Sequence, residues 1–118
     1  MYNIEFIFGV YELVSIEAFQ DDVYINEQTK SGMFTFTRDY KLSVVNSTTD
    51  WLMAYTGSFE IQSQDLVIHV VSCVITELEN TVIKRKILML DRENLILEAS
   101  GSDKAKKSRI TWKKVASI

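Results

Sequence analysis

The sequence predicts an all-β protein, a single eight-stranded antiparallel up-and-down β-barrel. The apolar residues recur mostly with period two or in short runs rich in β-branched and aromatic side chains, which is typical of strands. Proline is absent and the four glycines are scattered, so nothing marks a linker. Residues 1–118 are therefore predicted to form one domain.

Eight segments carry the strand pattern. Residues 2–8 (YNIEFIF), which precede them, fit either a short lead-in helix or an extra edge strand. In chain order the predicted strands are GVYELVSIE (9–17), GMFTFT (32–37), KLSVVN (41–46), YTGSFEI (55–61), LVIHVVSCVI (66–75), VIKRKILML (82–90), NLILEA (94–99) and RITWKKV (109–115).

The connections between these segments favour a closed barrel over a sandwich. Residues 18–31, 47–54 and 100–108 are long and 76–81 is of medium length, whereas 38–40, 62–65 and 91–93 are short. In an up-and-down meander alternate connections fall at the same end of the sheet, so the longer ones would share one rim. Such a barrel has no free edges and has room for side chains or one small ligand.

Composition excludes several function classes. The net charge of −3 and a pI near 5.1 give no electrostatic reason to bind nucleic acid or a membrane surface. One histidine and one cysteine do not make a usual zinc site, and no nucleotide-binding or serine-hydrolase motif is present, so no metal and no cofactor is predicted. We expect a cytoplasmic protein with a reduced Cys73, because the N-terminus lacks the features of a signal peptide and no apolar run approaches a membrane span.

An ordered set of short motifs resembles the bacterial lipocalin-like domain proteins. Those proteins open on Gly-x-Trp followed by a Leu-Val-Ser-like run, and their closing tryptophan is usually followed by an arginine. The matching elements come in the family's order with similar spacing: Gly9-Val10-Tyr11-Glu12-Leu13-Val14-Ser15, Gly32-x-Phe34-x-Phe36-Thr37, Tyr55-x-Gly57-x-Phe59, Ile68-His69-Val70, Arg85, Leu95-x-Leu97 and Ile110-Thr111-Trp112.

Two departures from the family pattern concern one end of the barrel. Tyr11 stands where the family has tryptophan, and Lys114 stands near the position of the arginine. The resemblance implies that this end keeps an aromatic ring and a cation. It also implies a small calyx that holds an apolar or amphipathic molecule, without naming that molecule.

His69 is a candidate ligand contact whose position depends on one turn. A three-residue loop at 62–64 would place His69 on the same face as Tyr55 and Phe59, whereas a two-residue loop at 63–64 would place Ile68 there. No turn signal decides between them, and we favour the first because it matches the family pattern. A hydrogen-bonded structural role is the alternative for this histidine.

Arg85 is predicted to point inward with Ile87 and Met89, while Lys84 and Lys86 point outward. A loop centred on residue 77 or 78 would set His69 opposite Arg85 or Ile87, within reach of a shared ligand group. A buried arginine needs an anionic or hydrogen-bonding partner. The candidates are a ligand carboxylate or carbonyl, or the protein carboxylates of Glu17, Glu60 and Glu98.

Six aromatic residues either fill the barrel interior or line a pocket in it: Tyr11, Phe34, Phe36, Tyr55, Phe59 and Trp112. Gly57 would locally widen that space or permit a bend. Trp51, Leu52 and Met53 fall in a predicted rim loop, where they would cap a pocket or pack against another subunit. Together with the doubly apolar strand 66–75, this loop suggests a homodimer, or a helix at 2–8 that covers the outside.

The leading hypothesis is a barrel that binds a small apolar or amphipathic molecule, with Arg85 and His69 on its polar group and the aromatic residues around its body. The first alternative is a small barrel enzyme, a cyclase or isomerase, in which a His, Tyr or Arg polarises a carbonyl. The second alternative is an oligomeric interaction module with a filled interior.

Overall fold

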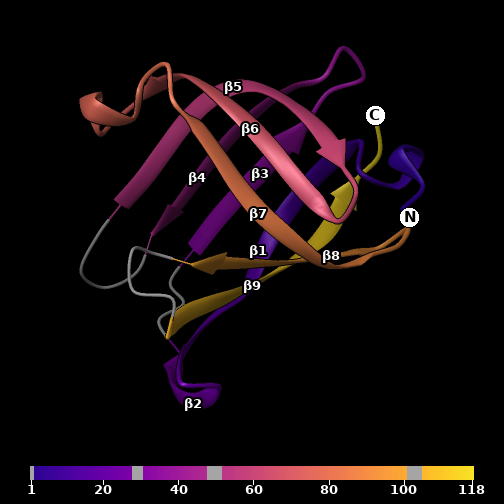
Figure 1. Cartoon of the computed structure of the whole chain (residues 1–118). Coiled ribbons are helices and arrows are strands. Elements are labelled where there is room, and N and C mark those ends of the chain that lie inside the picture. The colour runs from indigo at the N-terminus through magenta and orange to yellow at the C-terminus, as the bar shows by residue number, and fades with distance from the viewer. Residues whose placement is uncertain (1, 28–30, 48–51, 101–104) are drawn as a thin grey trace.

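The computed structural model describes residues 2–27, 31–47, 52–100 and 105–118. Within these ranges the chain is built almost entirely of strands, so the predicted all-β class is confirmed (Figure 1). The strands are β1 (Gly9–Gln20), β2 (Val23–Glu27), β3 (Ser31–Phe36), β4 (Lys41–Ser47), β5 (Leu52–Gln62), β6 (Asp65–Cys73), β7 (Val82–Leu90), β8 (Asn94–Ser100) and β9 (Lys106–Ala116). The described ranges also contain two short 3-10 helices, η1 (Ile4–Phe6) and η2 (Thr76–Leu78). Of the two alternatives for residues 2–8, a short lead-in helix or an edge strand, the structure shows the helix, η1.

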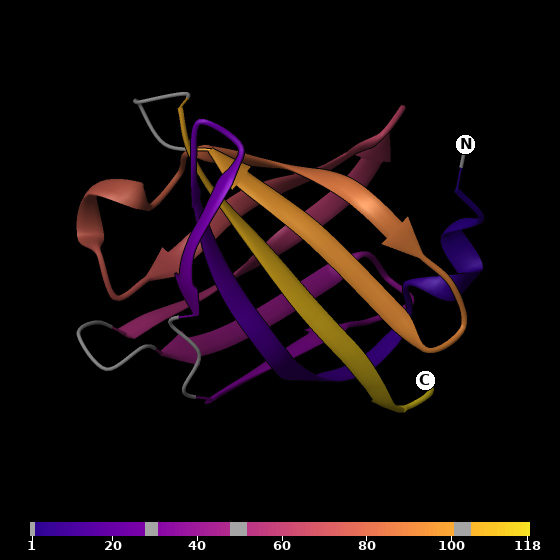
Figure 2. The same cartoon turned by 90° about the horizontal axis from the view of Figure 1, so that it is seen from below.

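Eight of these strands close into an antiparallel up-and-down barrel, as predicted. They pair in the order β1-β3-β4-β5-β6-β7-β8-β9, and β9 pairs with β1 to complete the ring. The tight turns after β3, β5 and β7 lie at the end of the barrel that carries η1 (Figures 1 and 2). The β1–β2 hairpin and η2 lie at the opposite end, which we call the mouth.

The segment 18–31 contains a ninth strand where the sequence suggested only a connection. β1 continues to Gln20, turns through Asp21 and Asp22, and returns as β2 along its own last residues. Both aspartates adopt left-handed backbone angles (φ 52° and 64°), as tight hairpins require. Every residue of β2 is exposed, so no burial pattern marks this strand in the sequence.

The turn between β5 and β6 is the two-residue alternative, Ser63-Gln64, and not the loop that the sequence analysis favoured. Phe59 pairs with Ile68, and both side chains are buried in the core. Ser58 pairs with His69, whose side chain is half exposed. The expectation that His69 faces the interior is therefore wrong, because a one-residue change of register exchanges the two faces of a strand.

The pairing of β6 with β7 also separates His69 from Arg85. His69 lies opposite Val82, and Leu66 lies opposite Arg85. Since Leu66 is fully buried, Arg85 points inward as predicted, and the two lysines that flank it are exposed. The predicted cross-strand pair of His69 with Arg85 or Ile87 does not form.

A β-bulge changes the end of β7. The register shifts between Ile87 and Met89, so that Met89 is exposed and Leu90 takes the next buried position. Ile87 is buried as predicted, and the inward direction expected for Met89 is wrong.

The half of the barrel next to η1 is filled with side chains. The rings of Tyr11 and Phe36 meet edge to face with centroids 5.7 Å apart, and Phe36 meets Phe59 at 5.1 Å. The single proton of the Tyr11 hydroxyl is shared between the carbonyl oxygens of Phe6 (2.9 Å) and Ile7 (3.0 Å). Lys114 Nζ donates to the Phe6 oxygen (2.6 Å) and lies 5.5 Å from the centre of the Tyr11 ring. This end therefore holds the aromatic ring and the cation that the motifs imply.

Candidate functional site

The other half of the barrel encloses a cavity of about 180 Å³. Its floor is made by Phe34 and Trp112, whose rings meet edge to face with centroids 5.2 Å apart. Phe34 in turn stacks on Phe36 at 4.2 Å, which joins the floor to the filled half. The cavity is lined by Ile16, Phe34, Val44, Asn46, Met53, Tyr55, Arg85, Leu97, Ala99, Ser108, Ile110 and Trp112.

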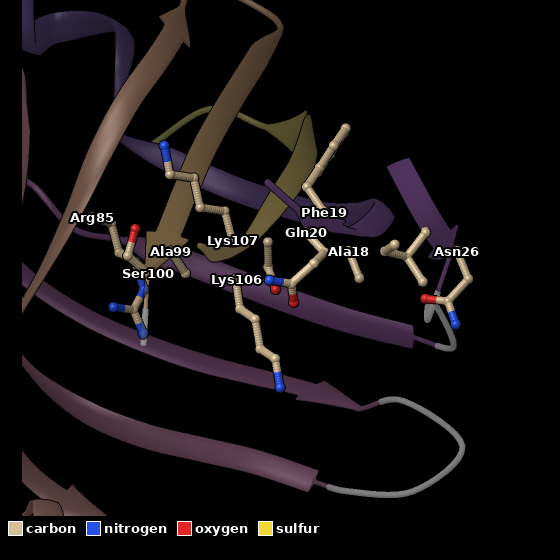
Figure 3. A pocket seen from close by; sticks show the side chains of 11 residues that line it. Ala18, Phe19, Gln20, Asn26, Arg85, Ala99, Ser100, Lys106 and Lys107 are labelled. Atoms are coloured by element: carbon tan, nitrogen blue, oxygen red, sulfur yellow. The ribbon is translucent and has the colours of Figure 1, made fainter. Parts of the chain in front are cut away.

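The cavity leads into a wider depression of about 480 Å³ at the mouth. Arg85, Ala99 and Ser108 belong to the linings of both spaces. The β1–β2 hairpin forms one wall of the depression, and Figure 3 shows Arg85 and Asn26 at its two ends with Lys106 between them. Among the described residues Arg85 thus lies between the apolar cavity and the depression, whose lining also includes Lys106 and Lys107.

Arg85 is the charged group that stands where the two spaces meet. The side chain is partly buried, and its Nη1 donates a hydrogen bond to the carbonyl oxygen of Lys84 (3.1 Å). Burial lowers the pKa of the Arg85 guanidinium, and the nearby Tyr55 hydroxyl opposes part of this fall. Arginine nevertheless stays charged at neutral pH, so the cavity contains a fixed positive charge.

The three protein carboxylates considered as partners for Arg85 do not pair with it among the described residues. Glu60 lies on the outer face, where its Oε1 is 3.6 Å from His69 Nε2. Glu98 Oε1 is 3.9 Å from Lys107 Nζ, which also lies 3.9 Å from Asp22 Oδ1. Glu17 makes no ion pair within the part of the chain that the structure describes. Among the described residues the Arg85 guanidinium thus has no carboxylate partner, and its one hydrogen bond goes to the Lys84 carbonyl oxygen.

Tyr55 brings a hydroxyl to the same cavity from β5. Burial raises the pKa of this hydroxyl, while the positive charge of Arg85 partly opposes the rise. Tyr55 is thus neutral at physiological pH and can donate or accept a hydrogen bond.

Four of the eight residues predicted to bind a ligand line the cavity: Phe34, Tyr55, Arg85 and Trp112. Tyr11, Phe36 and Phe59 are buried in the filled half and do not line it. His69 is on the outer surface beside Glu60, so it is not placed to meet a molecule in the cavity or to polarise a carbonyl there.

Asn46 and Met53 line the cavity, although Asn46 was not expected at the site and Met53 was expected in a rim loop. Asn46 continues the buried series Leu42, Val44 on β4, and this period of two was the signal that could have found it. Met53 lies within β5 and lines the cavity, instead of lying in a rim loop. Trp51, expected to cap the pocket, lies outside the described residues.

The described ranges contain no group of three or more His, Cys, Asp or Glu side chains placed to hold a metal ion. They also contain no helix that is long and apolar enough to cross a membrane.

The closed barrel and its interior cavity define a protein with the lipocalin-like fold. A lipocalin-like protein from Bacteroides uniformis superposes with a TM-score of 0.60 at 15% identity, over 92% of this chain and 98% of that one. An uncharacterised protein from Bacteroides eggerthii gives 0.56 at 12% identity, over 91% and 98% of the two chains. A redesigned β-barrel gives 0.54 at 13% identity, over 92% and 91%.

No family model and no curated protein matches the sequence. The resemblance found in the motifs is thus confirmed by the fold, which is shared at identities too low to carry a function across.

Proposed function

We propose that the protein binds a small amphipathic molecule with an acidic group inside its barrel. The acidic group binds Arg85 at the junction of cavity and mouth, and the apolar body lies against the floor formed by Phe34 and Trp112. His69, which the sequence analysis added to the polar contacts, has no part in this proposal because it lies on the outer face.

The position of Arg85 is the observation that carries the proposal. A guanidinium that points into an apolar cavity loses hydration, and this loss is offset only when an anion or a hydrogen-bond acceptor meets it. Among the described residues one acceptor does so, the Lys84 carbonyl oxygen at Nη1, and no carboxylate does. A ligand carboxylate would form two parallel charge-assisted hydrogen bonds with the guanidinium.

The cavity volume limits the size of the ligand. A protein cavity of about 150 Å³ holds a molecule such as benzene. The interior space of about 180 Å³ therefore accepts one ring or a short aliphatic chain. Larger parts of a ligand would extend into the depression at the mouth, past Arg85.

Octanoate and 1-octanol make a matched pair of probes, because their apolar bodies are similar and only one of them carries a charge. By isothermal titration calorimetry at pH 7 we expect octanoate to bind about tenfold more tightly, since a hydrogen bond to a charged group contributes about 1.5–3 kcal/mol. In an Arg85→Gln variant the two probes should bind with similar affinity.

Lys84→Gln is the matched control, because it removes a neighbouring positive charge that is exposed on the outer face. This variant should keep the preference for octanoate. Equal affinities of the two probes for the wild-type protein, or a preference that survives in Arg85→Gln, would contradict the proposed role of Arg85.

A cytoplasmic location and a homodimer stay predictions from the sequence. The dimer is supported by apolar side chains that are exposed on the outer face, among them Met33 and Val45, which pair across β3 and β4. Size-exclusion chromatography with light scattering measures the subunit number directly.

A further inference from the structure

The depression at the mouth has a positively charged lining. Among the described residues that line it, Arg85, Lys106 and Lys107 carry charge, and none is a carboxylate. The neutral polar side chains of the lining are Gln20, Asn26, Ser100 and Ser108, all of which can donate hydrogen bonds. Because the whole chain has a net charge of −3, this lining is a local excess of positive charge that attracts anions.

Lys106 continues the inner face of β9 toward the mouth. On this strand Trp112, Ile110 and Ser108 line the cavity. The pairing of β9 with β1 runs from Ile110 to Lys106 without a register shift, so the side chains alternate regularly between the two faces. Lys106 therefore lies on the same face as these three residues. It pairs with Gln20, which also lines the depression.

Lys107 belongs to the outer face and is already paired. Its Nζ lies 3.9 Å from Asp22 Oδ1 and 3.9 Å from Glu98 Oε1. In Figure 3 its side chain extends away from those of Lys106 and Arg85. Lys106, in contrast, makes no ion pair within the described part of the chain. Arg85 and Lys106 are thus the two inner-face cations without a carboxylate partner there.

These two cations lie close enough to bind one group between them. The register of β7 and β8 places Arg85 beside Ala99, and Ala99 pairs with Ser108 on β9. Two strand spacings separate the backbone of Arg85 from β9 by about 10 Å, and Lys106 lies about 7 Å farther along that strand. Both residues have long flexible side chains, and in Figure 3 both extend in the same direction.

We infer that the acidic group of the ligand is a phosphate monoester, bound between Arg85 and Lys106. A carboxylate has a single charge, which one guanidinium satisfies through two hydrogen bonds. A phosphate monoester carries close to two negative charges above neutral pH and has three acceptor oxygens. It therefore matches two cations at the rim of the cavity. This inference rests on the proposed function, which places the apolar body in the cavity, and it names the ligand class as alkyl or aryl phosphates.

n-Octyl phosphate and n-octyl sulfate are the probes, because they share a tail and a tetrahedral head and differ in charge. At pH 8 the phosphate is a dianion and the sulfate a monoanion. By isothermal titration calorimetry we expect the phosphate to bind about tenfold more tightly to the wild-type protein. In Lys106→Gln this preference should fall to about threefold or less, whereas Lys106→Arg, which keeps the charge, should retain it.

Lys113→Gln is the matched control, because Lys113 is an exposed lysine on the outer face of the same strand. This variant changes the net charge of the protein by the same amount as Lys106→Gln. It should keep the tenfold preference. Since both lysines are exposed, the thermal midpoints of the two variants should stay close to that of the wild type.

The outcomes separate this inference from the proposed function. Equal affinities of the two probes for the wild type, or a preference that persists in Lys106→Gln, would overturn the phosphate class. A preference that falls equally in Lys113→Gln would do the same, because net charge alone would then explain it. In each of these cases tight binding of octanoate leaves the proposed function standing. If octanoate and both octyl probes fail to bind, the proposed function fails, and the inference fails with it.

Discussion

At the scale of single residues, Arg85 and Asn46 share one property. Among the described residues neither side chain is fully paired: Arg85 has one hydrogen bond, to the Lys84 carbonyl oxygen, and no carboxylate partner, and the buried Asn46 Oδ1 has no partner. Proteins retain such groups where they bind something, at a cost in stability.

This cost gives a prediction for Arg85→Met, which keeps a long flexible side chain and removes the charge. The free energy of unfolding of the ligand-free protein should rise by about 1 kcal/mol, because Arg85 is partly buried without a carboxylate partner and replacing a desolvated charge by an apolar group is often stabilising. Urea denaturation at pH 7 measures the change. A fall in stability would show that the guanidinium has a structural role.

Tyr11 gives a pH-dependent prediction. Burial raises the pKa of its hydroxyl above the ordinary value of 10.0, with the charge of Asp91 as a smaller cause. Above pH 10 the unfolded chain loses this proton while the folded chain keeps it. The stability that Tyr11 contributes is thus complete below pH 10 and is lost as the pH rises beyond it.

The matching variant is Tyr11→Phe. At pH 8 it should be less stable than the wild type by about 1–2 kcal/mol, since the hydrogen bond that the hydroxyl shares between two buried backbone oxygens is lost. Between pH 9 and 11 the difference should shrink, because the variant lacks the titrating group. A difference that stays constant over this range would rule out the shifted pKa.

For single residues, the sequence predicted which side chains point into the barrel better than it predicted which of them line the cavity. Phe34, Tyr55, Arg85 and Trp112 were all expected at a ligand site and all line the cavity. The sequence could not separate them from Tyr11, Phe36 and Phe59, because all seven point inward. Which of them leave space depends on the side chains that fill the other half, such as Phe8 from the segment after η1.

At the scale of elements, the pairing of β5 with β6 depends on Gly57. The register shifts between Thr56 and Gly57, so that Gly57 pairs with Val70. A Cβ at this position would lie 2.0 Å from the His69 carbonyl oxygen. Of the two roles expected for this glycine, the structure supports the bend, because the two backbones approach too closely for any side chain.

Gly57→Ala should therefore destabilise the barrel by about 3 kcal/mol or more, through a clash with backbone that cannot move alone. Thermal unfolding followed by circular dichroism measures the effect. Thr56→Ala, at the exposed neighbouring position, should change the midpoint little. A Gly57→Ala protein as stable as the wild type would show that the bulge adapts easily.

The elements that the sequence failed to predict are those set by turns rather than by burial. The strand β2 is exposed throughout, so its residues carry no pattern beyond their β propensity. The Ser63-Gln64 turn has no Gly, yet Ser63 adopts a left-handed backbone angle (φ 57°). Neither Asp21-Asp22 nor Ser63-Gln64 is a strong hairpin signal, and the face of His69 depended on the second.

At the scale of the whole molecule, the barrel divides into a filled half and an open half. The aromatic residues near η1 fill one end, and the cavity at the other end borders the depression at the mouth, with Arg85 in the lining of both. A completely filled interior, as in the interaction-module hypothesis, is therefore not observed. The closed barrel was predictable from the alternation of connections, but the division into halves depends on packing in three dimensions.

The location of the ligand is the central claim, and nuclear Overhauser effects between bound octanoate and isotope-labelled protein test it most directly. We expect nuclear Overhauser effects from the terminal methyl group of octanoate to the rings of Phe34 and Trp112, with its carboxylate end near Arg85. Effects confined to exposed outer-surface side chains such as Val45 and Val71 would place the molecule outside the barrel, which would overturn the proposed ligand position.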